Sequence, residues 1–209
     1  TMTQVNSITG SLQASFGTAP EVASVVIALV VSTIIFGGIH WISKVSEKVV
    51  PFMAAAYIFA TVTIIALHLD QLLPALKSVF SGAFTGTAAI GGFAGATVKI
   101  AIQKGVARGV FSNESGLGSA PIAAAAAKTN EPVEQGLISM TGTFIDTIII
   151  CSLTGLSLLV SGEWMAKSST STLTQDTFTG VFGPVGGIIL TLCLVLFATT
   201  TILGWSYYG

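Results

Sequence analysis

Three consecutive hydroxyl-bearing residues, Thr199, Thr200 and Thr201, lie inside an apolar segment near the end of the chain. In an apolar helix, a threonine hydroxyl commonly bonds to the backbone carbonyl one turn earlier, which is a structural role. The same hydroxyls are also neutral oxygen ligands, which small hard cations prefer. Cation sites in transporters combine such oxygens with unwound backbone carbonyls. The triplet by itself leaves both interpretations open.

One carboxylate, Asp146, lies in the middle of another apolar segment, between Ile145 and Ile148. An ionisable group at membrane depth is energetically expensive and marks a functional site by default. Pairing with a neighbouring helix, or capping of a broken one, is an equally good explanation. The sequence does not separate these alternatives.

Residues 78–98 form an uncharged segment that is rich in glycine. Its glycines are Gly82, Gly86, Gly91, Gly92 and Gly95. Glycine weakens a helix because it loses the most backbone entropy on ordering. Unwound backbone at membrane depth is tolerated where it lines a cavity, and glycine-interrupted apolar segments point to substrate sites in transporters. The alternative is close helix packing through small residues, which the four-residue glycine spacing also favours.

The elements that position these residues are membrane-spanning helices. The 209 residues are 52% hydrophobic and 8% charged, whereas a soluble domain carries about 25% charged residues. Segments of about 20 apolar residues predict five crossings of an all-α polytopic membrane protein. These crossings are expected at about 22–41, 49–69, 84–106 (broken), 136–160 and 183–205.

The positive charges predict the orientation of these crossings. Five of the eight basic residues lie in two connecting segments on one side, which is the cytoplasmic side by the positive-inside rule. These residues are Lys44, Lys48, Lys104, Arg108 and Lys128. Residues 1–20 are then expected as an extracellular loop, and residues 107–135 as a cytoplasmic loop with a short helix.

Other classes of protein find no support. The net charge of −1 shows no nucleic-acid signature, and Cys151 and Cys193 indicate neither a disulfide framework nor a metal site. We find no paired acids at depth and no HExxH spacing, so an enzyme is not expected. The chain begins without methionine and ends at the inner end of a crossing, which favours an internal fragment of a larger carrier.

Residues 105–127, GVARGVFSNESGLGSAPIAAAAA, resemble the hallmark region of the alanine/glycine:cation symporter family. The resemblance extends to three further blocks, at residues 36–54, 81–98 and 144–156, and to TTILGWSYYG at 200–209. It therefore covers nearly the whole chain. The family's other signature, a broken glycine-rich helix near its N-terminus, is absent, as expected of a fragment.

The resemblance implies part of the five-plus-five inverted-repeat fold of the amino acid/polyamine/organocation superfamily. In that fold the first and sixth core helices are broken and hold the substrate, and the eighth with the first holds sodium. The five crossings match core helices four to eight, so the glycine-rich segment is the sixth and the threonine triplet lies on the eighth. The implied substrate-binding residues are Ile90, Gly91, Gly92, Phe93, Gly95, Trp205 and Ser206, and the implied sodium ligands are Thr200 and Thr201.

The function implied is sodium-coupled symport of alanine or glycine by alternating access, in the plasma membrane of a bacterium or archaeon. The partners are then sodium, the amino acid, the lipid bilayer and the remaining helices of the carrier. Proton coupling leaves a similar sequence pattern. The alternative from another class is a channel or a non-transporting membrane subunit whose glycines serve packing only, which conductance measurements distinguish from a carrier.

Overall fold

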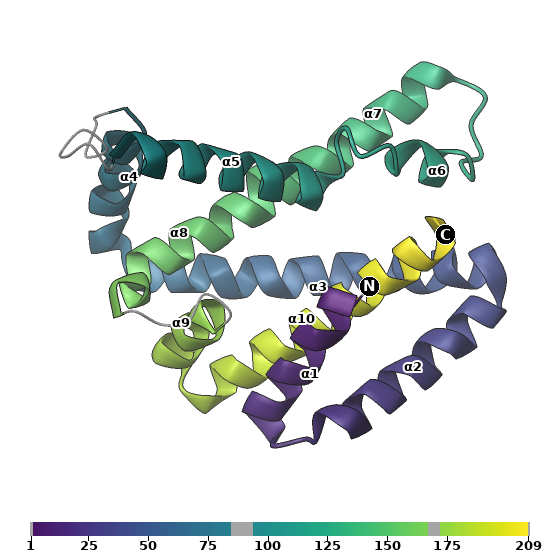
Figure 1. Cartoon of the computed structure of the whole chain (residues 1–209), viewed down its shortest axis with the longest axis horizontal. Coiled ribbons are helices and arrows are strands. Elements are labelled where there is room, and N and C mark those ends of the chain that lie inside the picture. Colours follow the sequence, from purple (N-terminus) through teal and green to yellow (C-terminus); the bar gives the residue numbers. More distant parts are fainter. Residues whose placement is uncertain (1, 85–93, 167–171, 209) are drawn as a thin grey trace. The chain divides into compact units, whose positions relative to one another are not determined.

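The computed structural model describes residues 2–84, 94–166 and 172–208, and most of these residues are helical, with no β-strand among them. Figure 1 shows the order of the elements along the chain. They are α1 (Met2–Phe16), α2 (Pro20–Phe36), α3 (Gly38–Leu67), α4 (Leu69–Phe84), α5 (Ala94–Asn113), α6 (Ala120–Ala124), α7 (Pro132–Thr143), the π-helix η2 (Phe144–Cys151), α8 (Ser152–Ser161), the short 3₁₀ helix η3 (Glu163–Ala166), α9 (Leu173–Phe182) and α10 (Pro184–Tyr208).

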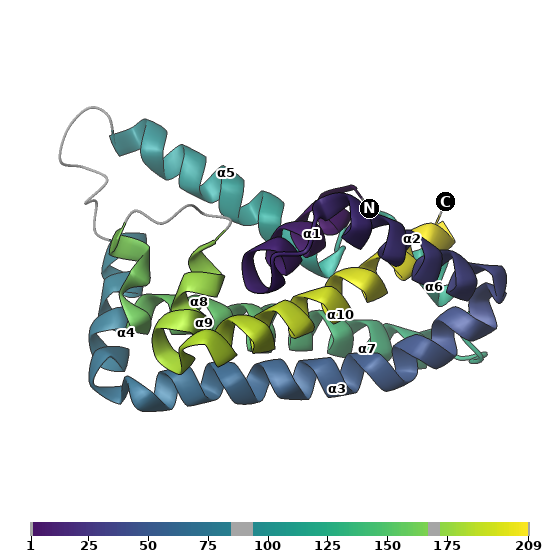
Figure 2. The same ribbon diagram turned by 90° about the horizontal axis from the view of Figure 1, so that it is seen from below.

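The chain divides into two compact units. The first consists of Thr1–Ile64 with Ser161–Gly209, and the second of Ile65–Val160. In the first unit α10 packs against α1, α2 and α9, as Figures 1 and 2 show. In the second unit α7, η2 and α8 follow one another without a break, and α5 packs against η2. Thr200, Thr201, Trp205 and Ser206 belong to the first unit, and Gly95 belongs to the second.

The core of the first unit is apolar and centres on α10. Its buried members are Ile8, Val31, Ile42, Ala198, Ile202 and Leu203. An aromatic cluster adds α3 and α9 to this packing. The Tyr57 ring stacks on Phe178 with centroids 6.0 Å apart and meets Phe197 edge-on at 5.7 Å. Offset and edge-on arrangements are the favourable ones for aromatic pairs.

The segment expected to be an extracellular loop, residues 1–20, contains helix α1. Ile8 is fully buried in the core, and Val5 and Leu12 pack against it. These three residues recur at spacings of three and four, so they share one face of a helix. Burial of this face against α10 is the reason that the segment is a helix rather than a loop.

Helix α3 begins at Gly38, eleven residues before the expected start of a crossing at Val49. The chain turns at Gly38, where a φ of +70° is one that glycine adopts without strain. Ile42 is buried in the core and Val45 packs against it, which favours a helix here. Pro51 therefore lies in the interior of α3.

Helices α9 and α10 approach one another closely at Gly186. A Cβ atom added there would lie 2.0 Å from the backbone oxygen of Phe178 and 2.6 Å from its carbonyl carbon. No side chain fits at such a distance unless the two helices separate, because the obstructing atoms belong to the backbone. This glycine is therefore required by packing.

Replacement of Gly186 by alanine is expected to destabilise the folded carrier by about 1–3 kcal/mol or more, as overpacking of a tight core does. Gly204→Ala on the same helix is the matched control, because nothing lies within 4 Å of a Cβ there. Thermal denaturation of the two variants in detergent should give a lower midpoint for Gly186→Ala. Equal midpoints would show that α9 and α10 do not approach in this way.

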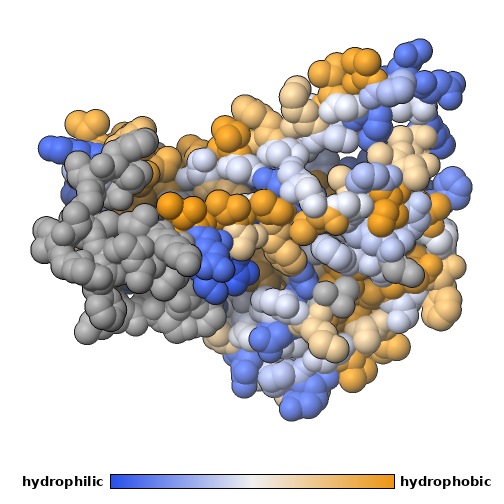
Figure 3. Space-filling view, turned by 45° about the horizontal axis from the view of Figure 1, so that its top comes forward, coloured by the Kyte–Doolittle hydropathy of each residue, from blue (hydrophilic) through white to orange (hydrophobic). Residues whose placement is uncertain are grey.

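Among the described residues, three continuous helical stretches are long and apolar enough to cross a membrane: Gly38–Leu67, Pro132–Ser161 and Pro184–Tyr208. Helix α2, with 17 residues, is apolar but shorter. Large apolar side chains are exposed on these helices, among them Leu29 at 64%, Phe59 at 75% and Leu192 at 54%. Figure 3 shows apolar atoms over the surface. Such faces are suited to lipid or to further helices, not to water.

Candidate functional site

The two implied sodium ligands lie side by side on α10. Thr200 donates its hydroxyl to the carbonyl oxygens of Phe197 at 2.9 Å and Leu196 at 3.1 Å. Thr201 donates to the same Phe197 carbonyl at 2.8 Å. Thr200 Oγ1 also lies 3.9 Å from Met53 Sδ of α3. These hydrogen bonds to carbonyls one turn earlier, called back-bonds below, are the ones expected of threonines with a structural role.

These back-bonds are compatible with cation binding. A hydroxyl has one proton and two lone pairs, so donation of the proton to a carbonyl leaves both lone pairs on the oxygen. A cation ligand needs a lone pair and not the proton. Because both hydroxyls share the Phe197 carbonyl, the structure holds Thr200 and Thr201 as a pair of half-buried oxygens.

Thr199, the third member of the triplet, belongs to a different environment. It lines a groove of about 270 Å³ between α10, α1 and α2. The other lining residues are mainly aliphatic, among them Val26, Val30 and Val195. Successive residues of a helix are rotated by about 100°, so one triplet presents hydroxyls in different directions. Thr199 thus provides a matched comparison for its neighbours.

Trp205 and Ser206 lie about one turn beyond the threonine pair on α10. The Trp205 ring packs edge-on against Tyr208, with centroids 5.5 Å apart and an angle of 72°. Ser206 donates its hydroxyl to the Leu203 carbonyl at 2.7 Å. These contacts are within one helix, and they leave the assignment of both residues to substrate binding a prediction.

Most of the predicted substrate-binding residues lie outside the described residues. Ile90, Gly91, Gly92 and Phe93 fall between the end of α4 and the start of α5, and so does most of the predicted helix break between Ile90 and Ala96. Gly95 lies in the first turn of α5, in the second unit. The binding-helix interpretation of this segment therefore stays a prediction.

A second polar cluster joins α5 to the π-helix η2. Ser112 Oγ lies 2.8 Å and 3.0 Å from the two carboxylate oxygens of Asp146. Thr147 Oγ1 lies 3.3 Å from Asp146 Oδ2 and accepts a hydrogen bond from Asn113 Nδ2 at 3.0 Å. The cluster thus ties the last turn of α5 to the carboxylate of an apolar helix.

The hallmark motif continues from this cluster into a tight loop. Glu114 adopts a φ of +57°, and Gly116 and Gly118 adopt +88° and +81°, which explains why these two positions of the motif are glycine. The buried Ser119 donates its hydroxyl to the Glu114 carboxylate at 2.7 Å. The loop therefore folds back on itself directly after the residues that contact Asp146.

Asp146 and the motif lie in separate segments of the sequence, and nothing in those segments predicts their contact. Ser112 and Asp146 are 34 positions apart, and only the packing of α5 on η2 brings them together. The sequence did contain two relevant features. One is the polar pair Ser112 and Asn113, and the other is a carboxylate, Asp146, in a segment that has no basic residue.

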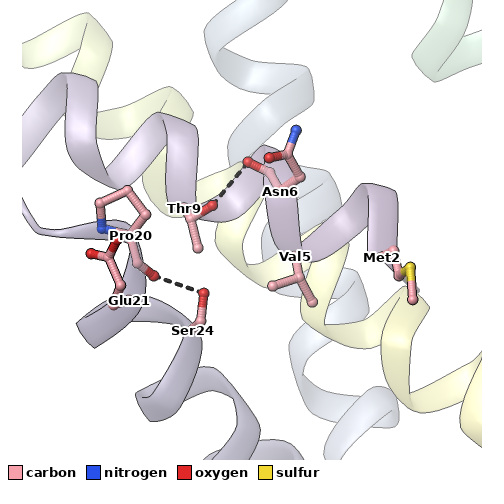
Figure 4. Close-up of a pocket in the computed structure, with 7 residues that line it drawn as sticks. All are labelled: Met2, Val5, Asn6, Thr9, Pro20, Glu21 and Ser24. Carbon is pink, nitrogen blue, oxygen red and sulfur yellow. Dashed lines mark hydrogen bonds between the residues drawn. The ribbon is translucent and has the colours of Figure 1, made fainter.

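A further groove, of about 520 Å³, lies between α1 and α2 (Figure 4). The hydroxyls of Thr9 and Ser24 donate to the carbonyls of Asn6 and Pro20, at 3.1 Å and 2.7 Å. The Asn6 amide and the Glu21 carboxylate are the remaining polar groups that line it. None of the residues predicted to bind substrate or sodium lines this groove.

Long apolar helices with exposed apolar faces define an all-α multi-pass membrane protein. The chain belongs to the sodium:alanine symporter family, whose model matches residues 1–209. This finding confirms the resemblance drawn from the motifs and the all-α fold class.

Sequence similarity to known proteins extends along the whole chain. It is 49% identical to an uncharacterized transporter of Haemophilus influenzae and 47% identical to the sodium/alanine symporter AgcS of Methanococcus maripaludis. In both comparisons 100% of this chain is covered, with 46% of the relative. The probable sodium/glutamine symporter GlnT of Bacillus subtilis is 36% identical over 99% of the chain and 42% of its own length. The chain spans about half the length of the curated relatives that it matches.

Proposed function

We propose that this chain contributes the central helices of a sodium-coupled symporter for a small neutral amino acid, alanine or glycine. The observation that carries the proposal is its 47% identity, over its whole length, to a relative named as a sodium/alanine symporter. The carrier moves its substrates without changing them chemically and resides in the plasma membrane, as a bacterial or archaeal inner-membrane protein.

In the proposed mechanism, the two ends of the zwitterion meet different parts of a broken helix. Carbonyls at Ile90 to Gly92 accept hydrogen bonds from the ammonium group, and half-helix N-termini face the carboxylate. Phe93 and Trp205 limit the space for the side chain, so that small substrates are preferred. Alternating access exposes this site to one side of the membrane at a time.

Sodium is proposed to bind to Thr200 and Thr201. The paired hydroxyl oxygens on α10 support this assignment, since their protons are directed to a backbone carbonyl and their lone pairs are left for an ion. In the superfamily fold the other ligands come from the first core helix, which is not within the 209 residues. Sodium and substrate are then coupled because both contact the same moving helices.

The proposal predicts sodium-driven, saturable uptake by the full-length carrier in proteoliposomes. An inward sodium gradient should accumulate labelled alanine, and a potassium gradient of the same size should not. Unlabelled alanine trapped inside should stimulate uptake by exchange. The alternative, a channel, predicts single-channel conductance and no exchange stimulation. A non-transporting subunit predicts neither signal, and either result would exclude the symporter.

A further inference from the structure

Asp146 brings a negative charge into the middle of a 30-residue apolar stretch, Pro132–Ser161. From residue 135 to 161 it is the one Asp, Glu, Lys or Arg of the sequence. A carboxylate in such a segment is costly unless a partner compensates its charge. The question is therefore what the partner is.

The partners of Asp146 in the described part of the chain are neutral. Both hydrogen-bonding groups are hydroxyls, of Ser112 and Thr147, and neither is a lysine, arginine or histidine. A carboxylate has about four acceptor positions, and a hydroxyl has one proton to donate. Two hydroxyls therefore leave acceptor positions unused and leave the charge of the carboxylate uncompensated.

The oxygens lie slightly closer together than the ligands of one small ion do. Hard cations bind oxygens at about 2.3–2.6 Å, so two ligands at a right angle lie about 3.4 Å apart. The oxygen–oxygen distances of Asp146 to Ser112 and Thr147 are 2.8–3.3 Å. A slight separation of these groups admits an ion between them. Ser112 and Thr147 then turn their lone pairs toward it, and Asn113 Nδ2 already donates to Thr147 from the other side.

The backbone at this point is also unusual. Asp146 and Thr147 lie in the eight-residue π-helix Phe144–Cys151. Such π-helical turns are rare within α-helices and are frequent at functional sites. Here the π-helix places two adjacent polar residues opposite the end of α5, within the hallmark motif.

We propose that Asp146, Ser112 and Thr147 bind a small monovalent cation, at a site composed of other residues than the Thr200 and Thr201 pair. One carboxylate with neutral hydroxyls matches a single positive charge, and sodium is the probe that the proposed coupled function provides. The inference rests on that function for the identity of the ion. Binding there fastens the end of α5, and with it the motif loop, to η2.

The test is equilibrium binding of ²²Na⁺ to the purified full-length carrier in detergent. Asp146→Asn is expected to remove one class of sodium site, with a loss of affinity of at least tenfold. Ser112→Ala should weaken the same class several-fold, and Ser112→Thr should restore it because the hydroxyl returns. The class should persist in Thr200→Val.

Thr141→Val is the matched control, because the Thr141 hydroxyl bonds only to the carbonyl of Leu137 on its own helix among the described residues. It should leave sodium binding unchanged. If Asp146→Asn binds sodium as the parent does but melts at a lower temperature, the hydrogen bonds of the cluster only stabilise the contact between α5 and η2, and the proposal is overturned. If Asp146→Asn does not fold, Ser112→Ala decides in the same way.

Uptake by the unmodified carrier separates this inference from the proposed function. A carrier that shows no sodium-driven uptake, but loses a sodium site in Asp146→Asn, supports the site and contradicts the symporter. Sodium-driven uptake with unchanged ²²Na⁺ binding in Asp146→Asn and Ser112→Ala supports the symporter and contradicts the site.

Discussion

Replacement of Thr200 or Thr201 by valine should raise the sodium concentration for half-maximal alanine uptake at least tenfold. Each change removes one oxygen from a cation without placing a charge in the membrane. Hydrogen bonds to charged groups contribute about 1.5–3 kcal/mol, and we expect a similar loss for an oxygen that contacts an ion. A loss of 1.4 kcal/mol corresponds to a factor of about ten in affinity. The measurement is initial uptake against sodium concentration in proteoliposomes.

The structural role of these hydroxyls predicts a different pattern. Both donate to the Phe197 carbonyl, and removal of such a back-bond has a small effect on a helix. Thr199→Val is the matched control, since Thr199 lines the aliphatic groove beside α2. We expect an unchanged sodium dependence in this control. Unchanged half-saturating sodium in Thr200→Val and Thr201→Val, at normal expression, would assign the whole triplet to packing.

Replacement of Phe93 by alanine should relax the preference for small amino acids. If this ring closes the side-chain pocket, its removal admits larger substrates. A methylene group in an apolar pocket changes specificity by about 10- to 200-fold, and a change within this range is expected for valine relative to alanine. The measurement is the ratio of kcat/KM values for the two amino acids. Glutamine is a useful third substrate, given the name of the relative GlnT.

Phe80→Ala on α4 is the control for this experiment. Phe80 is 62% exposed and lies shortly before Phe93 in the sequence. Its removal therefore tests the loss of an aromatic side chain that is not proposed to contact the substrate. Its alanine-to-valine ratio should equal that of the parent. If the alanine-to-valine ratio in Phe93→Ala also equals that of the parent, Phe93 does not limit the substrate pocket and has a packing role that faces lipid.

Much of the helical framework follows from apolar length. The predicted crossing 136–160 lies within Pro132–Ser161, and the predicted crossing 183–205 begins one residue before the stretch Pro184–Tyr208. Pro132 and Pro184 stand at the first positions of these stretches, where a missing N–H costs nothing. Such signals are local, so one sequence is sufficient to detect them.

The features that local signals do not predict depend on tertiary packing. Residues 1–20 were expected as an extracellular loop from the distribution of basic residues, yet they contain α1, on which Ile8 is buried against α10. Helix α3 extends back to Gly38 because Ile42 belongs to the same core. In both cases a partner helix supplies the stabilisation that the segment lacks by itself.

The same distinction between local signals and tertiary packing applies to the candidate sites. Thr200 and Thr201 are neighbours in the sequence, so their pairing on one helix is predictable. The contact between Ser112 and Asp146 is not, because it depends on where α5 ends relative to the π-helix η2. A π-helix shifts every later side chain around the axis, and composition does not reveal it.

Reciprocal linkage between sodium and alanine is the most direct test of sodium-coupled symport. The measurement is equilibrium binding to the purified full-length carrier, of labelled alanine at a series of sodium concentrations and of ²²Na⁺ with and without saturating alanine. Coupling requires each ligand to raise the affinity of the other by the same factor. We expect the Kd of alanine to fall as sodium rises, and the Kd of sodium to fall equally with alanine. Independent binding of the two ligands would contradict a symporter.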